Sequence, residues 1–150
     1  MAFKRFVTLT LASGFGIGYA PIIPGTAGSL AAAILHFMLP LEEPAWILII
    51  TAAFVAGIWS GTLVEREYGK DPPLVVIDEF VGQWLTFSFL PMDLLTLTGG
   101  FLLFRIFDIS KPFPVNRAQR LKGGLGIMLD DVIAAVYAHA SLRLILLIIS

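Results

Sequence analysis

The sequence contains no cysteine in 150 residues, which excludes disulfide bonds, thiolate metal sites and a cysteine nucleophile. Charged residues are also scarce, at 14% of the chain against about a quarter in an ordinary soluble domain. With a formal net charge of −1, the chain lacks the basic surface typical of nucleic-acid binding. No segment has the GxxxxGKS/T pattern of a phosphate-binding loop, so nucleotide binding is only weakly supported.

Apolar residues are abundant instead, at 57% of the sequence. Residues 44–64 carry no charge and, at about 1.5 Å per residue, extend about 31 Å, which is enough to cross a bilayer. Shorter apolar segments indicate four more helices, at 28–40, 79–90, 94–107 and 131–149. We therefore predict one all-α domain over residues 1–150, a small polytopic helical membrane bundle whose short helices are tilted or re-entrant. A soluble domain with very hydrophobic helices is the alternative.

Lysine and arginine are distributed unevenly among these segments. If residues 81–107 form a hairpin that turns at 91–93, nearly all of them fall on one side, and the turns on the other side, at 41–44 and 91–93, contain none. An excess of positive charge marks the cytoplasmic side of a membrane protein. The residues from Lys4 to Ala12 resemble a short signal peptide without a clean cleavage site, so we expect them to remain in the chain.

Acidic residues interrupt the apolar sequence at several points. They are Asp78 and Glu79, Asp108, Asp130 and Asp131, and a weaker run of Glu65, Glu67 and Asp71. Carboxylates are costly in or beside hydrocarbon, so they indicate a functional site. The predicted topology brings them to the cytoplasmic interface, where Asp78 and Glu79 open one helix and Asp130 and Asp131 open another.

Each acidic pair has a structural and a functional interpretation. A single acid at a helix start is enough to cap the helix. Two adjacent acids exceed that need, and carboxylates are the ligands that Mg²⁺ prefers. We therefore expect Asp78 and Glu79 to bind a divalent metal together with Asp130 or Asp131, and which of these last two contacts the metal stays open.

Positive charge adjoins Asp108. Arg105 lies three residues before it on the same helical face, and Lys111 follows three residues after it. A surface ion pair would explain this spacing. Its place at the end of an apolar helix instead favours Asp108 as a metal ligand and Arg105 or Lys111 as a phosphate clamp.

A stretch rich in glycine and proline, residues 14–28, leads into the first apolar helix. Thr26 or Ser29 can cap that helix, whose free N–H groups suit a phosphate. An irregular loop that only packs against the bundle is an equally good interpretation.

The chain resembles the phosphatidylglycerophosphatase A family in four motifs, which occur in the order PIIPGTAGSL (21–30), VVIDEFVGQW (75–84), FRIFDISKPFPV (104–115) and KGGLGIMLDDVIAA (122–135). The resemblance covers essentially the whole chain. It implies a small helical protein of the bacterial inner membrane that removes the terminal phosphate of phosphatidylglycerophosphate with Mg²⁺ and leaves phosphatidylglycerol.

The resemblance also implies roles for individual residues. The acidic site residues would be Asp78, Glu79, Asp108, Asp130 and Asp131, and the phosphate would lie among Gly25, Thr26, Ser29, Arg105 and Lys111. The metal ligands would be Asp78, Glu79, Asp108 and Asp131. One carboxylate that is not bound to metal, Asp78 or Asp131, could take the proton from an attacking water, and a covalent aspartyl-phosphate is also open.

Three other classes of protein fit parts of this pattern. A transporter or channel would place its acids near the middle of its spans, whereas these acids are predicted at helix ends. A structural subunit would not need five acids beside two cations. A phosphotransferase acting between lipid headgroups needs no nucleotide loop and stays an alternative.

Overall fold

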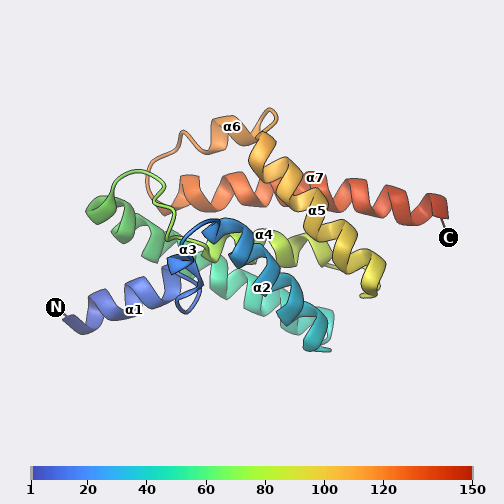
Figure 1. Ribbon diagram of the computed structural model, residues 1–150, viewed down its shortest axis with the longest axis horizontal. Coiled ribbons are helices and arrows are strands. Elements are labelled where there is room, and N and C mark those ends of the chain that lie inside the picture. Colours follow the sequence, from blue (N-terminus) through green and yellow to red (C-terminus); the bar gives the residue numbers. More distant parts are fainter. Residues whose placement is uncertain (1, 150) are drawn as a thin grey trace.

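The computed structural model describes residues 2–149, and every regular element in that range is helical (Figure 1). The predicted all-α class is therefore confirmed. The elements are α1 (Ala2–Ala12), the 3-10 helix η1 (Ile17–Tyr19), α2 (Pro24–Met38), α3 (Glu43–Tyr68), α4 (Ile77–Phe87), α5 (Leu94–Ser110), α6 (Val115–Ala118) and α7 (Gly124–Ile149).

The two longest helices, α3 and α7, are long and apolar enough to cross a membrane. Each has 26 residues, or about 39 Å at the rise of an α-helix. Only 28% of the most apolar window of α3 and 22% of that of α7 are buried inside the protein. The other residues of these windows are partly or fully exposed, which is consistent with a small helical membrane protein.

Helix α4 is too short to cross a membrane and lies at the centre of the bundle instead (Figure 1). Its 11 residues extend about 16 Å, and nearly all of them are buried. Gly82 permits the close packing, because a Cβ atom there would collide with the ring of Phe104 and lie 3.2 Å from the carbonyl oxygen of Asp131. The first turn of α4, which carries Asp78 and Glu79, is thereby held inside the protein between α2 and α7.

Helix α7 begins at Gly124, well before the predicted start at residue 131, so the prediction that Asp130 and Asp131 open this helix is wrong. Gly124, which precedes these acids, is a packing residue, since a Cβ atom there would collide with the backbone carbonyl of Ile58 in α3. Asp130 and Asp131 consequently lie inside the helix, about two turns from its start.

The N-terminal helix α1 was not among the predicted helices. It packs against α3, and Arg5 forms an exposed ion pair with Glu67. The rings of Phe3 and Phe6 are exposed beside Lys4 and Arg5. The apolar run of α1 is too short to cross a membrane, so its length did not predict a helix. Its only sequence signal is the amphipathic pattern of aromatic residues next to basic ones near its start.

Candidate functional site

A cavity of about 420 Å³ opens where α2, α4, α5 and α7 meet. All five predicted acids line it, and so do both predicted cations and two residues of the first turn of α2: Asp78, Glu79, Asp108, Asp130, Asp131, Arg105, Lys111, Gly25 and Thr26. Ser29, the remaining predicted contact, lies behind this lining and accepts a hydrogen bond from Arg105 Nη1 at 3.3 Å. Residues that are up to about a hundred positions apart in the sequence thus share one site.

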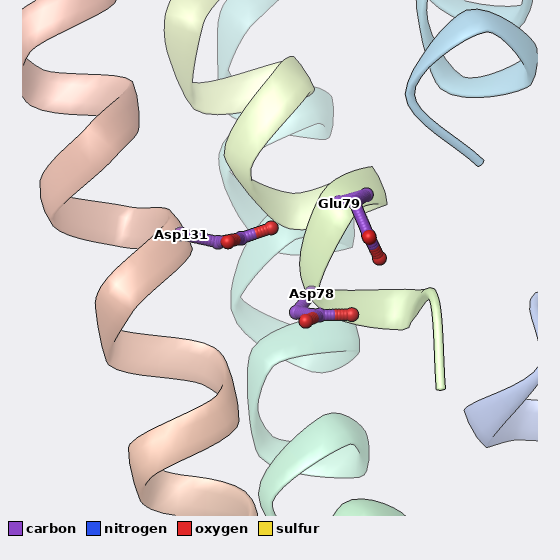
Figure 2. Close-up of side chains that lie close together, drawn as sticks. All are labelled: Asp78, Glu79 and Asp131. Carbon is purple, nitrogen blue, oxygen red and sulfur yellow. The ribbon is translucent and has the colours of Figure 1, made fainter. Parts of the chain in front are cut away.

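Three of the acids form a compact group, here called the carboxylate cluster: Asp78, Glu79 and Asp131 (Figure 2). Each offers one carboxylate oxygen, and these oxygens all lie within 4.8 Å of one another. One oxygen of each side chain, namely Asp78 Oδ1, Glu79 Oε2 and Asp131 Oδ2, is buried and has no hydrogen-bond partner. Buried polar atoms are normally paired, so this group lacks a partner that carries positive charge.

The donor set fits a hard divalent cation. Mg²⁺ and Ca²⁺ take oxygen ligands, and carboxylates are the ligands that Mg²⁺ sites commonly use. The three carboxylates meet from two helices, with Asp78 and Glu79 on α4 and Asp131 on α7. Asp108, the fourth predicted metal ligand, is not part of this group, and its role in metal binding stays a prediction.

Burial changes the acidity of the two α4 carboxyls, which lie outside the candidate membrane-spanning helices. Burial raises the pKa of Glu79 to about 7. Burial, together with the neighbouring charges of Glu79 and Asp131, raises the pKa of Asp78 well above its usual range. Without a cation the cluster therefore favours bound protons, which a metal ion would displace.

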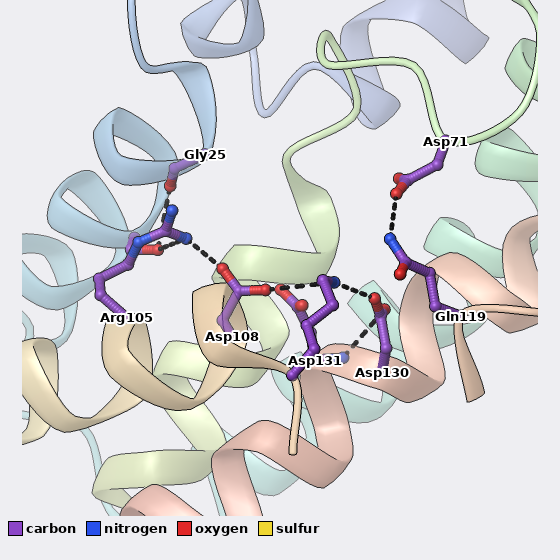
Figure 3. Close-up of polar contacts among 9 residues, drawn as sticks. Gly25, Asp71, Arg105, Asp108, Gln119, Asp130 and Asp131 are labelled. Carbon is purple, nitrogen blue, oxygen red and sulfur yellow. Dashed lines mark hydrogen bonds and ion pairs between the residues drawn. The ribbon is translucent and has the colours of Figure 1, made fainter. Parts of the chain in front are cut away.

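The other side of the cavity holds a second group, here called the ion-paired group: Arg105, Asp108, Lys111 and Asp130 (Figure 3). Asp108 pairs with Arg105, and its other oxygen lies 3.6 Å from Lys111 Nζ. Lys111 also pairs with Asp130. Although burial opposes the charge, the carboxylates of Asp130 and Asp108 raise the pKa of Lys111 above its ordinary value. The ammonium group therefore stays charged.

The first turn of α2 faces the cavity. Its N-cap is Ile23, without a side-chain cap, and the Ser29 hydroxyl donates to the Gly25 carbonyl at 3.0 Å (Figure 3). The prediction that Thr26 or Ser29 caps this helix is therefore wrong. The N–H groups of Gly25 and Thr26 have no intrahelical acceptor, and a Cβ atom at Gly25 would collide with Glu79 Oε1. The turn thus offers donors beside the acids, and a side chain at position 25 would displace the carboxylate of Glu79.

The weaker acidic run divides between the site and the surface. Asp71 lines the cavity, where it accepts a hydrogen bond from Gln119 Nε2 at 2.9 Å. Glu65 accepts a hydrogen bond from the backbone of Gly123, and Glu67 pairs with Arg5, so neither belongs to the cavity. Gln119 was not predicted, because a lone glutamine in a basic loop gives no sequence signal.

Comparison with known proteins gives a consistent result. The family model described as phosphatidylglycerophosphatase A matches residues 10–146. A relative from Bacteroides thetaiotaomicron, named putative phosphatidylinositol-3-phosphatase, is 41% identical over 143 residues, which cover 89% of this chain and 89% of that protein. Proteins named phosphatidylglycerophosphatase A are 37% identical in Escherichia coli, over 90% of this chain and 81% of theirs, and 41% identical in Haemophilus influenzae, over 85% and 82%. No solved structure matches the chain.

Proposed function

The chain belongs to the phosphatidylglycerophosphatase A family, and on that premise we propose that it is a Mg²⁺-dependent lipid phosphatase that converts phosphatidylglycerophosphate to phosphatidylglycerol and phosphate. We further propose that it works in the inner membrane of a bacterium with its cavity open to the cytoplasm. The lysine and arginine distribution supports this orientation, since the basic residues Lys111, Arg117 and Arg120 follow the cavity end of α5.

One observation carries the proposal: a single cavity holds a carboxylate cluster with three unpartnered buried oxygens next to two partly buried cations. The cluster suits a divalent cation, and the cations suit the oxygens of a phosphate monoester. Phosphate monoesters are among the slowest biological substrates to hydrolyse unaided. A metal ion at the carboxylate cluster and the two cations would together neutralise the negative charge of the phosphate during its transfer.

Asp78, Glu79 and Asp131 would hold the metal ion. When bound, Mg²⁺ supplies positive charge that neutralises phosphate oxygens and orients an attacking water. The remaining chemistry belongs to the residues of the chain. The substrate phosphate would lie between the cluster and Arg105, whose Nε is buried and has no partner, so it can donate to a phosphate oxygen.

Lys111 and the first turn of α2 would complete the phosphate site. Lys111 contributes a fixed charge, and the free N–H groups of Gly25 and Thr26 in the cavity lining would offset negative charge that grows during transfer. In the direct route, water oxygen bonds to phosphorus and the bond to the glycerol oxygen breaks, while Asp131 or Asp78 takes a proton from the water through a carboxylate oxygen that does not bind the metal. That carboxyl group then returns the proton to the leaving alkoxide, which becomes phosphatidylglycerol. A route through an aspartyl-phosphate would use the same groups.

A second substrate has a specific observation in its favour. The Bacteroides relative is named for phosphatidylinositol 3-phosphate, and it is as similar to this chain as the Haemophilus phosphatidylglycerophosphatase A. Both lipids present a phosphate monoester on a hydroxylated headgroup, so the same phosphate site would serve either. The rim formed by Asp71 and Gln119 offers hydrogen-bonding groups to those hydroxyls.

The decisive experiment is phosphate release by purified protein in detergent micelles. Phosphatidylglycerophosphate and phosphatidylinositol 3-phosphate are compared with Mg²⁺ and with EDTA, and Asp78→Asn is compared with Glu67→Gln, an acid outside the cavity. We expect Mg²⁺-dependent release from phosphatidylglycerophosphate that EDTA and Asp78→Asn abolish and Glu67→Gln preserves. Circular dichroism checks that each variant is folded.

Two results would contradict the proposal. Faster release from the inositol lipid would assign the headgroup to the second candidate. If folded protein released phosphate from neither lipid, the phosphatase proposal would be wrong. Transport would then be the next hypothesis, because α7 carries two acids inside the helix, and ion flux in liposomes would test it.

A further inference from the structure

Two exposed isoleucines lie at the mouth of the cavity that holds the acids and cations. Ile23 immediately precedes α2, and Ile109 is in the last turn of α5. Both line the cavity, yet their exposed fractions are 58% and 69%. Single exposed apolar residues are common on any surface. Here two of them lie at the same opening, one next to α2 and one on α5. We call this part of the rim, formed by Ile23 and Ile109, the apolar rim.

The opposite rim is different in character. It is formed by the loop at residues 71–73, where Asp71 is hydrogen-bonded to Gln119. One side of the opening therefore offers hydrogen-bonding groups, from Asp71 and Gln119, to a headgroup. The side formed by Ile23 and Ile109 offers only apolar side chains. A ligand that matches both sides is amphiphilic.

The apolar rim continues along α5 away from the cavity. Leu102, Ile106 and Ile109 are exposed by 53%, 58% and 69%. Their spacing of four and then three residues places them on one face of the helix, over about 10 Å of its length. The stripe begins at the cavity and has no covering element among residues 2–149.

Helix α5 packs lengthwise against α7, the second candidate membrane-spanning helix. Near the cavity Phe104 packs with Ala134 and Ala135, and farther away Cβ atoms at Gly99 and Gly100 would each lie 3.2 Å from the side chain of Leu142. The two helices therefore run antiparallel beside each other. A membrane that surrounds α7 also reaches the exposed face of α5, and hydrocarbon is the medium that this stripe would meet.

We propose that the acyl chains of the lipid substrate leave the cavity between Ile23 and Ile109 and lie along Ile106 and Leu102. This inference rests on the proposed lipid phosphatase function and adds the binding surface for the apolar part of the substrate. The phosphate stays between the carboxylate cluster and Arg105, while the chains remain in the membrane along α5. The lipid need not leave the bilayer to reach the site.

The kinetic test uses Ile109→Gln and Ile23→Gln, with Val136→Gln as the matched control. Val136 is 62% exposed on α7 and does not line the cavity. Each variant is assayed with long-chain phosphatidylglycerophosphate and with the same headgroup without acyl chains. For the two rim variants we expect KM for the lipid to rise about tenfold, with unchanged kcat/KM for the chain-free compound and no change in Val136→Gln.

A binding test separates failure of this inference from failure of the proposed function. The chain has no cysteine, so Ile109→Cys and Val136→Cys each accept a single bimane label. Phosphatidylglycerol with brominated acyl chains is added in detergent micelles. We expect quenching at position 109 that saturates and is reversed by unbrominated phosphatidylglycerol, and quenching at position 136 that only follows the lipid content of the micelle.

Equal quenching at both positions, or rim variants that slow the lipid and the chain-free compound alike, would overturn the acyl-chain surface. The kinetic result requires that the wild-type protein hydrolyse phosphatidylglycerophosphate, whereas the quenching result is independent of the headgroup assignment. If the wild-type protein hydrolyses neither lipid, the proposed function fails, and the quenching experiment still decides whether α5 binds acyl chains.

Discussion

The two halves of the cavity use the same residue types in opposite ways. In the carboxylate cluster, Asp78, Glu79 and Asp131 face one another and leave buried oxygens without partners. In the ion-paired group, Asp108 and Asp130 are neutralised by Arg105 and Lys111. The first half is electrostatically incomplete, whereas in the second half each acid is paired with a cation of the chain. An acid in the first half is therefore suited to bind a ligand, and it lowers the stability of the protein when no ligand is present. An acid in the second half also stabilises the fold through its ion pair.

The largest expected effect comes from removing one acid of the cluster. Asp131→Asn should lower the rate of phosphate release on the order of a thousandfold, the scale of losing a preorganised electrostatic group. The same change should raise the melting temperature of the metal-free protein, because it relieves repulsion among buried carboxylates. Activity assays and thermal unfolding in EDTA measure the two effects.

The control for this variant is Glu67→Gln, which removes an exposed acid of the α1–α3 ion pair. Neither its activity nor its melting temperature should change appreciably. If Asp131→Asn instead lowered the melting temperature of the metal-free protein, the cluster would be held together by interactions within the chain, and the contrast between the two halves would be wrong.

Removing a cation from the ion-paired group should destabilise the protein, whereas removing an acid from the carboxylate cluster should stabilise its metal-free form. Arg105→Met leaves Asp108 buried with only the more distant Lys111, and we expect a loss of about 3 kcal/mol in the free energy of unfolding. The matched control is Arg5→Met, whose partner is exposed, and its expected cost is below about 1 kcal/mol. Chemical denaturation of both variants tests the prediction, and equal costs would contradict it.

The sequence was sufficient to pick out the five acids and two cations that the cavity brings together. Charged side chains within apolar segments are costly, so Asp78, Glu79 and Asp108 stood out without any structure. The division of the acids into two groups was not predictable, because it depends on how closely α4 approaches its neighbours. That approach is set by Gly82, where Phe104 and the Asp131 carbonyl leave no room for a side chain.

The helix boundaries show a similar limit. Asp93 was predicted to precede a helix, and it caps α5 by accepting a hydrogen bond from the Thr96 backbone at 2.8 Å. Local chemistry sets that boundary, so the sequence reveals it. The start of α7 depends instead on contact between Gly124 and the backbone of Ile58. A glycine that breaks a helix and one that packs it against a neighbour look the same in sequence.

The smallest effect concerns pH and would sharpen the contrast between the halves. The folded pKa of Glu79 is raised to about 7 from an ordinary 4.5, so the folded metal-free protein binds more protons than the unfolded chain between these values. The contribution of Glu79 to the stability of the metal-free protein should therefore be greatest below about pH 4.5 and should be lost as the pH rises through 7. Mg²⁺ competes with those protons, so its stabilising effect should grow over the same range. Melting temperatures in EDTA and in Mg²⁺ at pH 5, 6, 7 and 8 test this, and a Mg²⁺ effect that is constant with pH would show that protons and metal do not share the cluster.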